Sequence, residues 1–133
     1  MKAIPNSHQD LFKDETKAYV FLATVMPDGS PQVTPTWFSA DGEYILINTA
    51  KGRVKDKNMR ARPQVALVVQ DPKTPYRYLQ IRGRVVGITE EGANEHINAL
   101  SFKYDNAPYK LVKGQIRVIY KIVPDSVDAH TRG

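Results

Sequence analysis

Short apolar segments alternate with turn residues along most of the chain, a pattern that predicts a mainly β protein. Six segments have the β-branched and aromatic composition of strands: Lys17–Val25, Pro31–Phe38, Tyr44–Asn48, Gln64–Gln70, Tyr76–Val86 and Ile116–Val123. Tight turns at Pro27-Asp28-Gly29 and Asp41-Gly42 imply antiparallel hairpins. We therefore predict one domain over residues 1–133, a six-stranded antiparallel sheet closed into a small or split β-barrel.

Prolines and a glycine predict where this sheet is irregular. Pro35 has no N–H to donate to a ladder, so its strand is expected at an edge or at a bulge. Gly83 indicates a bulge or a close backbone approach within its strand. Pro124 is expected to end the last strand.

Helices are predicted at three places between the strands. Ser7-His8-Gln9-Asp10 has the form of a loose capping box, which predicts a short helix over Ser7–Glu15. A second helix is expected within the basic stretch that follows the third strand. The third helix is expected over Glu90–Phe102, where apolar residues recur at helical spacing.

The composition is that of a globular domain without thiol chemistry. Hydrophobic residues make up 41% and charged residues 25% of the 133 residues. No apolar run approaches the ~20 residues that span a bilayer, and the first residues lack the apolar core of a signal peptide. The absence of cysteine excludes disulfides and thiolate chemistry. We expect a cytoplasmic protein.

The sequence contains no motif typical of hydrolytic or metal-dependent enzymes. No serine lies in a nucleophile-elbow pattern, and no metal-binding motif is present. His8, His96 and His130 lie among polar residues and are expected at the surface. An enzyme of this composition would need a cofactor for its chemistry.

The stretch Thr49–Pro63 is the most basic part of a chain with a net charge of +5. It contains Lys51, Arg53, Lys55, Lys57, Arg60 and Arg62, opposed only by Asp56. On a helix these cations divide between two nearly opposite faces, which disfavours a continuous nucleic-acid stripe.

Two interpretations of the basic stretch stay open. The order strand, glycine turn, helix suits an anion held by Thr49, the Gly52 backbone, Arg53 and Lys55. The alternative is a solvated helix whose charges keep the protein soluble. Arg60 and Arg62 have a third option, which is to pair with acidic neighbours or with a partner subunit.

The second predicted strand has a polar face with two interpretations. Gln32, Thr34 and Thr36 recur at period two, as in a solvated sheet face or in a groove for a polar heterocycle. Trp37, the single tryptophan, is expected in the core.

Three segments in register resemble a known family. They are ATVMPDGSPQVTPTWF (Ala23–Phe38), INTAKGRVKDKNMRARPQVALVVQD (Ile47–Asp71) and YLQIRGRV (Tyr78–Val85). Together they resemble the pyridoxamine 5′-phosphate oxidase-like flavin and deazaflavin oxidoreductases, which have the split β-barrel fold. The resemblance extends over about Leu11–Val123.

The resemblance implies a homodimer that binds a flavin-type cofactor at the subunit interface and transfers a hydride to or from a small unsaturated or quinone-like substrate. It assigns the cofactor phosphate to Asn48 or Thr49, Arg53 and Lys55, with Lys51 and Arg60 nearby. It assigns the ring to Gln32, Thr34 and Thr36, and it gives Gln70 and Tyr76 to the partner subunit's site. No residue is assigned as a catalytic acid, base or nucleophile.

Two cofactors stay open, and so does more than one class of function. The chain lacks the Arg-Leu-rich end of true pyridoxamine phosphate oxidases, and its basic GRVKDKNMRARP resembles the branch that uses coenzyme F420. FMN is the alternative cofactor. The alternatives to an enzyme are a non-catalytic flavin or deazaflavin carrier and a nucleic-acid-binding barrel. The strands lack the interleaved aromatic and basic residues that stack bases, which argues against nucleic-acid binding.

Overall fold

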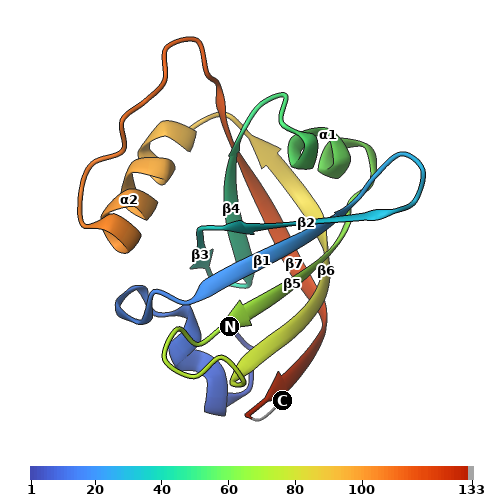
Figure 1. Cartoon of the computed structure of the whole chain (residues 1–133), viewed down its shortest axis with the longest axis vertical. Coiled ribbons are helices and arrows are strands. Elements are labelled where there is room, and N and C mark those ends of the chain that lie inside the picture. The colour runs from blue at the N-terminus through green and yellow to red at the C-terminus, as the bar shows by residue number, and fades with distance from the viewer. Residues whose placement is uncertain (132–133) are drawn as a thin grey trace.

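The computed structural model describes residues 1–131 as one curled antiparallel sheet with helices at its margins (Figure 1). The strands are β1 Tyr19–Val25, β2 Pro31–Thr36, β3 Phe38–Asp41, β4 Tyr44–Ala50, β5 Gln64–Gln70, β6 Tyr78–Thr89 and β7 Arg117–His130. Their order across the sheet is β2-β1-β5-β6-β7-β4-β3. The predicted mainly β, antiparallel split barrel is confirmed, but the sheet has seven strands rather than six.

The additional strand arises because the predicted strand Pro31–Phe38 is interrupted at Trp37. β2 and β3 follow each other in the chain yet lie at opposite edges of the sheet. The two edges of the sheet are therefore connected by the chain itself at Trp37, and β2 and β3 do not pair with each other through backbone hydrogen bonds (Figure 1). The edge position predicted from Pro35 is confirmed.

The interior of the curled sheet is filled by alternate side chains of the strands. Core residues include Leu22, Leu67, Ile81 and Tyr120, each almost completely buried. The composition of Lys17–Val25 predicts a largely buried strand, but the outward side chain of Phe21 in β1 is only partly covered. This difference leaves an apolar outer surface on the β1 side of the sheet.

The bulge predicted at Gly83 is confirmed, and it also explains why β7 continues past Pro124. The register shifts at Gly83, which lies opposite Pro124. A Cβ on Gly83 would lie 2.4 Å from the carbonyl oxygen of Val123, so only glycine fits this approach. The expectation that Pro124 ends the strand is wrong, because Pro124 lies beside the bulge, an irregularity that tolerates proline.

The N-terminal segment forms two 3₁₀ turns, Asn6–Phe12 and Asp14–Thr16, instead of one α-helix. The predicted capping box is absent, because the Ser7 hydroxyl pairs with His8 Nδ1 at 2.7 Å. His8 is 1% exposed, and its Nε2 lies 3.0 Å from the His130 carbonyl oxygen. The expectation of a surface position for His8 is therefore wrong.

Helix α2 spans Ala93–Asp105, beginning three residues later than predicted, and packs beside β4 and β7. Helix α1 spans Val54–Ala61, within the basic stretch as predicted. Neither is long and apolar enough to cross a membrane, and the same holds for every helix in residues 1–131.

Asp56 fixes helix α1 to the sheet. Its carboxylate is 2% exposed and accepts hydrogen bonds from the Gly52 amide at 2.8 Å, from Arg60 Nε at 2.9 Å and from the Tyr120 hydroxyl. Burial alone would raise the pKa of Asp56, but these donors outweigh it and hold the pKa below its ordinary value of 3.8. One carboxylate thus joins the turn, the helix and the core.

Replacing this carboxylate should destabilise the fold in a pH-dependent way. Asp56→Asn leaves buried donors facing an amide and should lower the free energy of unfolding by about 3 kcal/mol at pH 7. Because the folded pKa is depressed, the carboxylate stabilises fully above the unfolded pKa, and this contribution disappears as pH falls through the folded value. Urea titrations at several pH values measure both effects.

The matched control is Lys57→Asn in the same helix, where the side chain is exposed and a change within about 0.5 kcal/mol is expected. Equal effects of the two variants, or a difference that grows in acid, would contradict the role given to Asp56.

Candidate functional site

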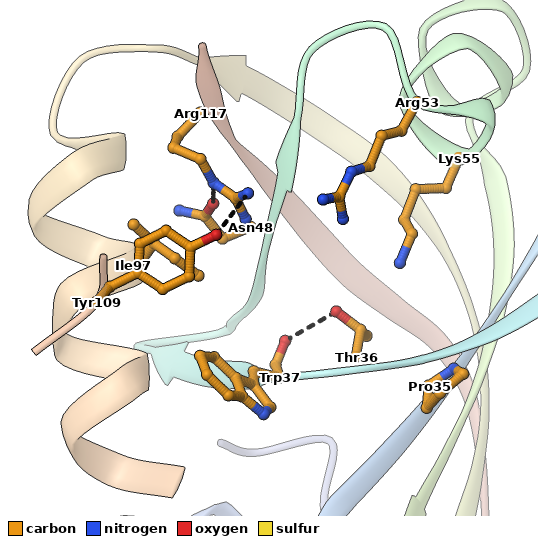
Figure 2. Close-up of a pocket in the computed structure, with 9 residues that line it drawn as sticks. All are labelled: Pro35, Thr36, Trp37, Asn48, Arg53, Lys55, Ile97, Tyr109 and Arg117. Atoms are coloured by element: carbon orange, nitrogen blue, oxygen red, sulfur yellow. Dashed lines mark hydrogen bonds between the residues drawn. The ribbon is translucent and has the colours of Figure 1, made fainter. Parts of the chain in front are cut away.

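A cavity of about 230 Å³ opens where the barrel is split, between α1, α2 and the β2–β3 junction (Figure 2). It is lined by Pro35, Thr36, Trp37, Asn48, Arg53, Lys55, Ile97, Tyr109 and Arg117. The volume is below the ~300 Å³ at which small-molecule sites usually begin. It suits one anionic part of a larger ligand, or a site that a second subunit completes.

The turn before α1 brings Arg53 and Lys55 to one wall of this cavity. Gly52 adopts φ +97°, a left-handed conformation that glycine favours, and α1 begins two residues later. Arg53 is the N-cap residue and Lys55 lies in the first turn, and both side chains point into the cavity (Figure 2). Lys57 lies instead beside Met26 and Pro27, on another surface. Helical spacing places Arg53 on one face with Lys57 and Arg60, with Lys55 opposite, and this grouping is wrong, because Arg53 is the N-cap residue and lies with Lys55.

The opposite wall contains a cation that the sequence analysis missed. Arg117 begins β7 and is only 5% exposed, and its Nε donates to Asn48 Oδ1 at 2.8 Å. The two residues lie on neighbouring strands, because Ala50 of β4 pairs with Arg117. The available signal was an arginine inside the apolar segment IRVIYKIV.

The cavity is positively charged without a compensating acid. Within residues 1–131 no carboxylate lies within 4.0 Å of Arg53, Lys55 or Arg117. Burial lowers the pKa of the Lys55 ammonium, and the nearby charges of Arg53 and Arg117 lower it further. The pKa of Arg117 is lowered as well, first by burial and also by Arg53. This arrangement favours an anionic ligand.

Behind Arg117 a polar network orients the cavity wall. Asn48 Nδ2 donates to the Ala93 carbonyl at 2.9 Å and lies 3.1 Å from His96 Nδ1, while His96 Nε2 lies 2.9 Å from the Ser39 hydroxyl. Burial, with the charge of Arg117, lowers the pKa of His96 to about 4. The neutral ring accepts at Nδ1 and donates from Nε2. The expectation of a surface position for His96 is therefore wrong.

The polar face of β2 points toward the inside of the barrel, while Val33 between Thr34 and Gln32 is 65% exposed. Thr36 lines the cavity. Gln32 Oε1 accepts from the Thr24 hydroxyl at 2.9 Å, which places it on the α1 side. The Thr34 hydroxyl is buried with no hydrogen-bond partner in the described part of the chain.

The remaining predicted phosphate residues divide between the site and its surroundings. Asn48 lines the cavity, and the Thr49 hydroxyl is buried and has no partner among residues 1–131. Lys51 Nζ lies 3.1 Å from Glu90, and Arg60 is engaged by Asp56. The Gly52 amide, which the sequence analysis aimed at a ligand, donates to Asp56 instead.

Gln70 and Tyr76 lie away from this cavity. Gln70 lines a separate outer groove of about 410 Å³ and donates to the Pro75 carbonyl at 3.2 Å. Tyr76 is exposed in the adjacent loop. In a dimer, these two residues would be free to approach the equivalent cavity of the partner subunit.

Trp37 forms part of the cavity and not of the buried core, contrary to expectation. Its ring stacks on Tyr104 of α2, with centroids 5.4 Å apart and planes inclined by 6°. The next residue, Phe38, accepts a hydrogen bond at its carbonyl from the buried Lys103 ammonium at 2.8 Å. Consecutive residues of α2 therefore hold the β2–β3 junction in place.

Comparison with known proteins agrees with this fold. The family model described as pyridoxamine 5′-phosphate oxidase matches residues 7–129. A solved F420 reductase is 36% identical, with a TM-score of 0.82, over 94% of this chain and 98% of its own. The search of curated proteins finds no match.

More distant solved structures share the fold. A conserved hypothetical protein from Mycobacterium tuberculosis is 22% identical, with a TM-score of 0.73, over 96% of this chain and 84% of its own. The heme storage protein HutZ from Vibrio cholerae is 17% identical, with a TM-score of 0.70, over 96% of each chain.

The fold and the family match define a split-barrel protein. More specifically, the chain belongs to the pyridoxamine 5′-phosphate oxidase family. This is the family that the three sequence segments resemble.

Proposed function

We propose that this protein is an oxidoreductase that binds coenzyme F420 or FMN and transfers a hydride to or from a small unsaturated or quinone-like substrate. The observation that carries the proposal is the pair of cations without carboxylate partners, Arg53 and Lys55, at the cavity of a chain in this family. Such a cavity favours a bound anion, and flavin-type cofactors bring a phosphate.

The residues at the cavity fit a cofactor phosphate. Arg53 offers a planar fork of donors and Lys55 a point charge, the combination that binds phosphate oxygens well. Asn48 adds a polar side chain to the lining, and the next residue, Thr49, has a buried hydroxyl without a partner in residues 1–131. We assign the phosphate to these residues and give Lys51 and Arg60 a supporting electrostatic role.

The polar face of β2 is the proposed border of the cofactor ring. Thr34 has a buried hydroxyl in need of a partner, and Thr36 already lines the cavity. With Gln32 they present hydroxyl and amide groups that match the edge of a pyrimidine ring. The bound ring supplies hydride chemistry, while the protein positions it and limits solvent access. No side chain is assigned as an acid or base.

Coenzyme F420 is the cofactor that we favour over FMN. The F420 reductase structure resembles this chain over nearly its entire length. Lys51, Arg60 and the other cations near α1 also suit a cofactor with a long anionic tail. FMN, which carries a phosphate but no such tail, would use fewer of these charges.

A second copy of the chain is the partner proposed for the apolar outer surface. The outer groove is lined by Phe21, Ala23, Val33, Val68 and Tyr78, among others. Exposed apolar surfaces of this kind mark interaction sites. A dimer through this surface would cover Val33 and would give Gln70 and Tyr76 a place near the partner's site.

A non-catalytic carrier is the alternative, because the heme storage protein shows that this fold also serves storage. Turnover separates the two. An enzyme should reoxidise the reduced cofactor in the presence of at least one member of a panel of quinones and enones, at a rate proportional to protein concentration. Binding without turnover across the panel would favour the carrier.

Removing the proposed phosphate ligands should abolish tight cofactor binding without unfolding the protein. The double variant Arg53→Ala/Lys55→Ala should weaken binding of F420 or FMN at least 100-fold, since charge-assisted hydrogen bonds contribute about 1.5 to 3 kcal/mol each. Cofactor fluorescence titrations measure the affinity.

The apo form of this double variant should unfold at an unchanged or slightly higher temperature, because like charges without partners are removed. Lys57→Ala is the matched control and should bind normally. A large loss of apo stability in the double variant, with little loss of affinity, would show that Arg53 and Lys55 are structural.

The proposed dimer surface has its own test. Val33→Asp should produce monomers in sedimentation velocity, because burying an unpaired carboxylate at an apolar interface is costly. Val112→Asp, at another exposed valine in the loop before β7, is the control and should leave the assembly intact. Unchanged assembly in both variants would place the interface elsewhere.

A further inference from the structure

Arg117 is a buried cation whose hydrogen-bond partners within residues 1–131 are all neutral. Nε donates to Asn48, and Nη1 donates to Gln115 Oε1 at 3.2 Å and lies 3.5 Å from the Tyr109 hydroxyl. The guanidinium carbon lies 5.4 Å from the centroid of the Tyr109 ring. Buried arginines are normally paired with an acid. Within residues 1–131 Arg117 has none, which leaves the guanidinium available to an anionic ligand.

The charge of the cavity exceeds what one phosphate neutralises. Three cations line it, at Arg53, Lys55 and Arg117. A phosphate monoester carries about 1.5 to 2 negative charges at pH 7, and a phosphodiester carries about one. At least about one positive charge is left over in either case. The cavity can therefore accept a second anionic group, which either the tail of the cofactor or a substrate would supply.

The position of Arg117 separates this second anion from the first. Arg53 and Lys55 approach from the α1 side, whereas Arg117 lies across the cavity beside Tyr109 and Ile97 (Figure 2). Trp37 forms the adjoining surface. An anchored guanidinium next to aromatic and aliphatic surfaces matches a small flat molecule with a carboxylate at one end.

We propose that Arg117, oriented by Asn48 and Tyr109, binds the carboxylate of the substrate, and that the substrate is a small conjugated carboxylic acid. The inference rests on the proposed function and narrows its substrate from unsaturated compounds in general to anionic ones. Ile97 and Trp37 contact the flat carbon chain, while Arg53 and Lys55 stay with the phosphate.

The test uses Trp37 as its reporter, because the chain has one tryptophan and its ring lines the cavity. Purified full-length protein is titrated with sorbate, a flat conjugated acid, and with sorbamide, its neutral counterpart, with and without saturating cofactor. Sorbate should change Trp37 emission saturably in at least one of the two states. Sorbamide should bind about 10- to 100-fold more weakly, the effect of losing hydrogen bonds to a charged group.

Two variants locate the effect. Arg117→Gln should weaken sorbate to the level of sorbamide while changing cofactor affinity less than threefold, and Arg117→Lys should lie between. Lys57→Gln, outside the cavity, is the matched control and should behave as the wild type. Apo Arg117→Gln should melt no lower than the wild type, because an unpaired buried charge is removed.

Equal binding of sorbate and sorbamide by the wild type, or saturable binding of neither, would overturn the proposal even if the variants failed to fold. A loss of cofactor affinity in Arg117→Gln as large as in Arg53→Ala would overturn it too, because Arg117 would then serve the cofactor. Failure of the proposed function is a separate result, in which neither cofactor binds while the response to sorbate in the apo protein is unaffected.

Discussion

The arrangement of this molecule depends on how the chain passes between the two edges of its sheet at Trp37. β2 and β3 are consecutive, yet they lie at opposite ends of the strand order, so the barrel is closed by one residue and not by a ladder. Lys103 holds the Phe38 carbonyl, and Tyr104 stacks on Trp37. Because α2 holds the junction in place, a cavity remains in the gap beside it. The candidate site is therefore a direct consequence of the fold.

The charges at this gap have a cost that the rest of the molecule offsets. Arg53, Lys55 and Arg117 face one another without an acid among the described residues, which destabilises the apo protein. The single acid of the basic stretch, Asp56, is turned away and joins Gly52, Arg60 and Tyr120. The carboxylate that holds α1 in place is thus kept apart from the three cations of the cavity. Sites that sacrifice stability in this way are characteristic of function.

The sequence predicted the features that depend on local chemistry. Gly29 and Gly42 adopt positive φ at the two predicted hairpins, and Gly83 lies at a bulge as expected. The order of strand, glycine turn and helix also grouped Arg53 with Lys55, whereas helical spacing wrongly grouped Arg53 with Lys57. Features that depend on distant contacts were missed. Trp37 interrupts a strand because it stacks on α2, and Arg117 reaches the cavity only through pairing of β7 with β4. The burial of His8 and His96 likewise depends on segments far away in the sequence.

A crystal structure of the protein with F420 or FMN bound would test the central proposal most directly. We predict that the cofactor phosphate lies between Arg53 and Lys55, with oxygen-to-nitrogen distances of about 2.7 to 2.9 Å. The ring should lie along Gln32, Thr34 and Thr36, and the side of the cavity at Arg117 should stay open. A phosphate bound elsewhere, with Arg53 and Lys55 still directed into an empty cavity, would contradict the account.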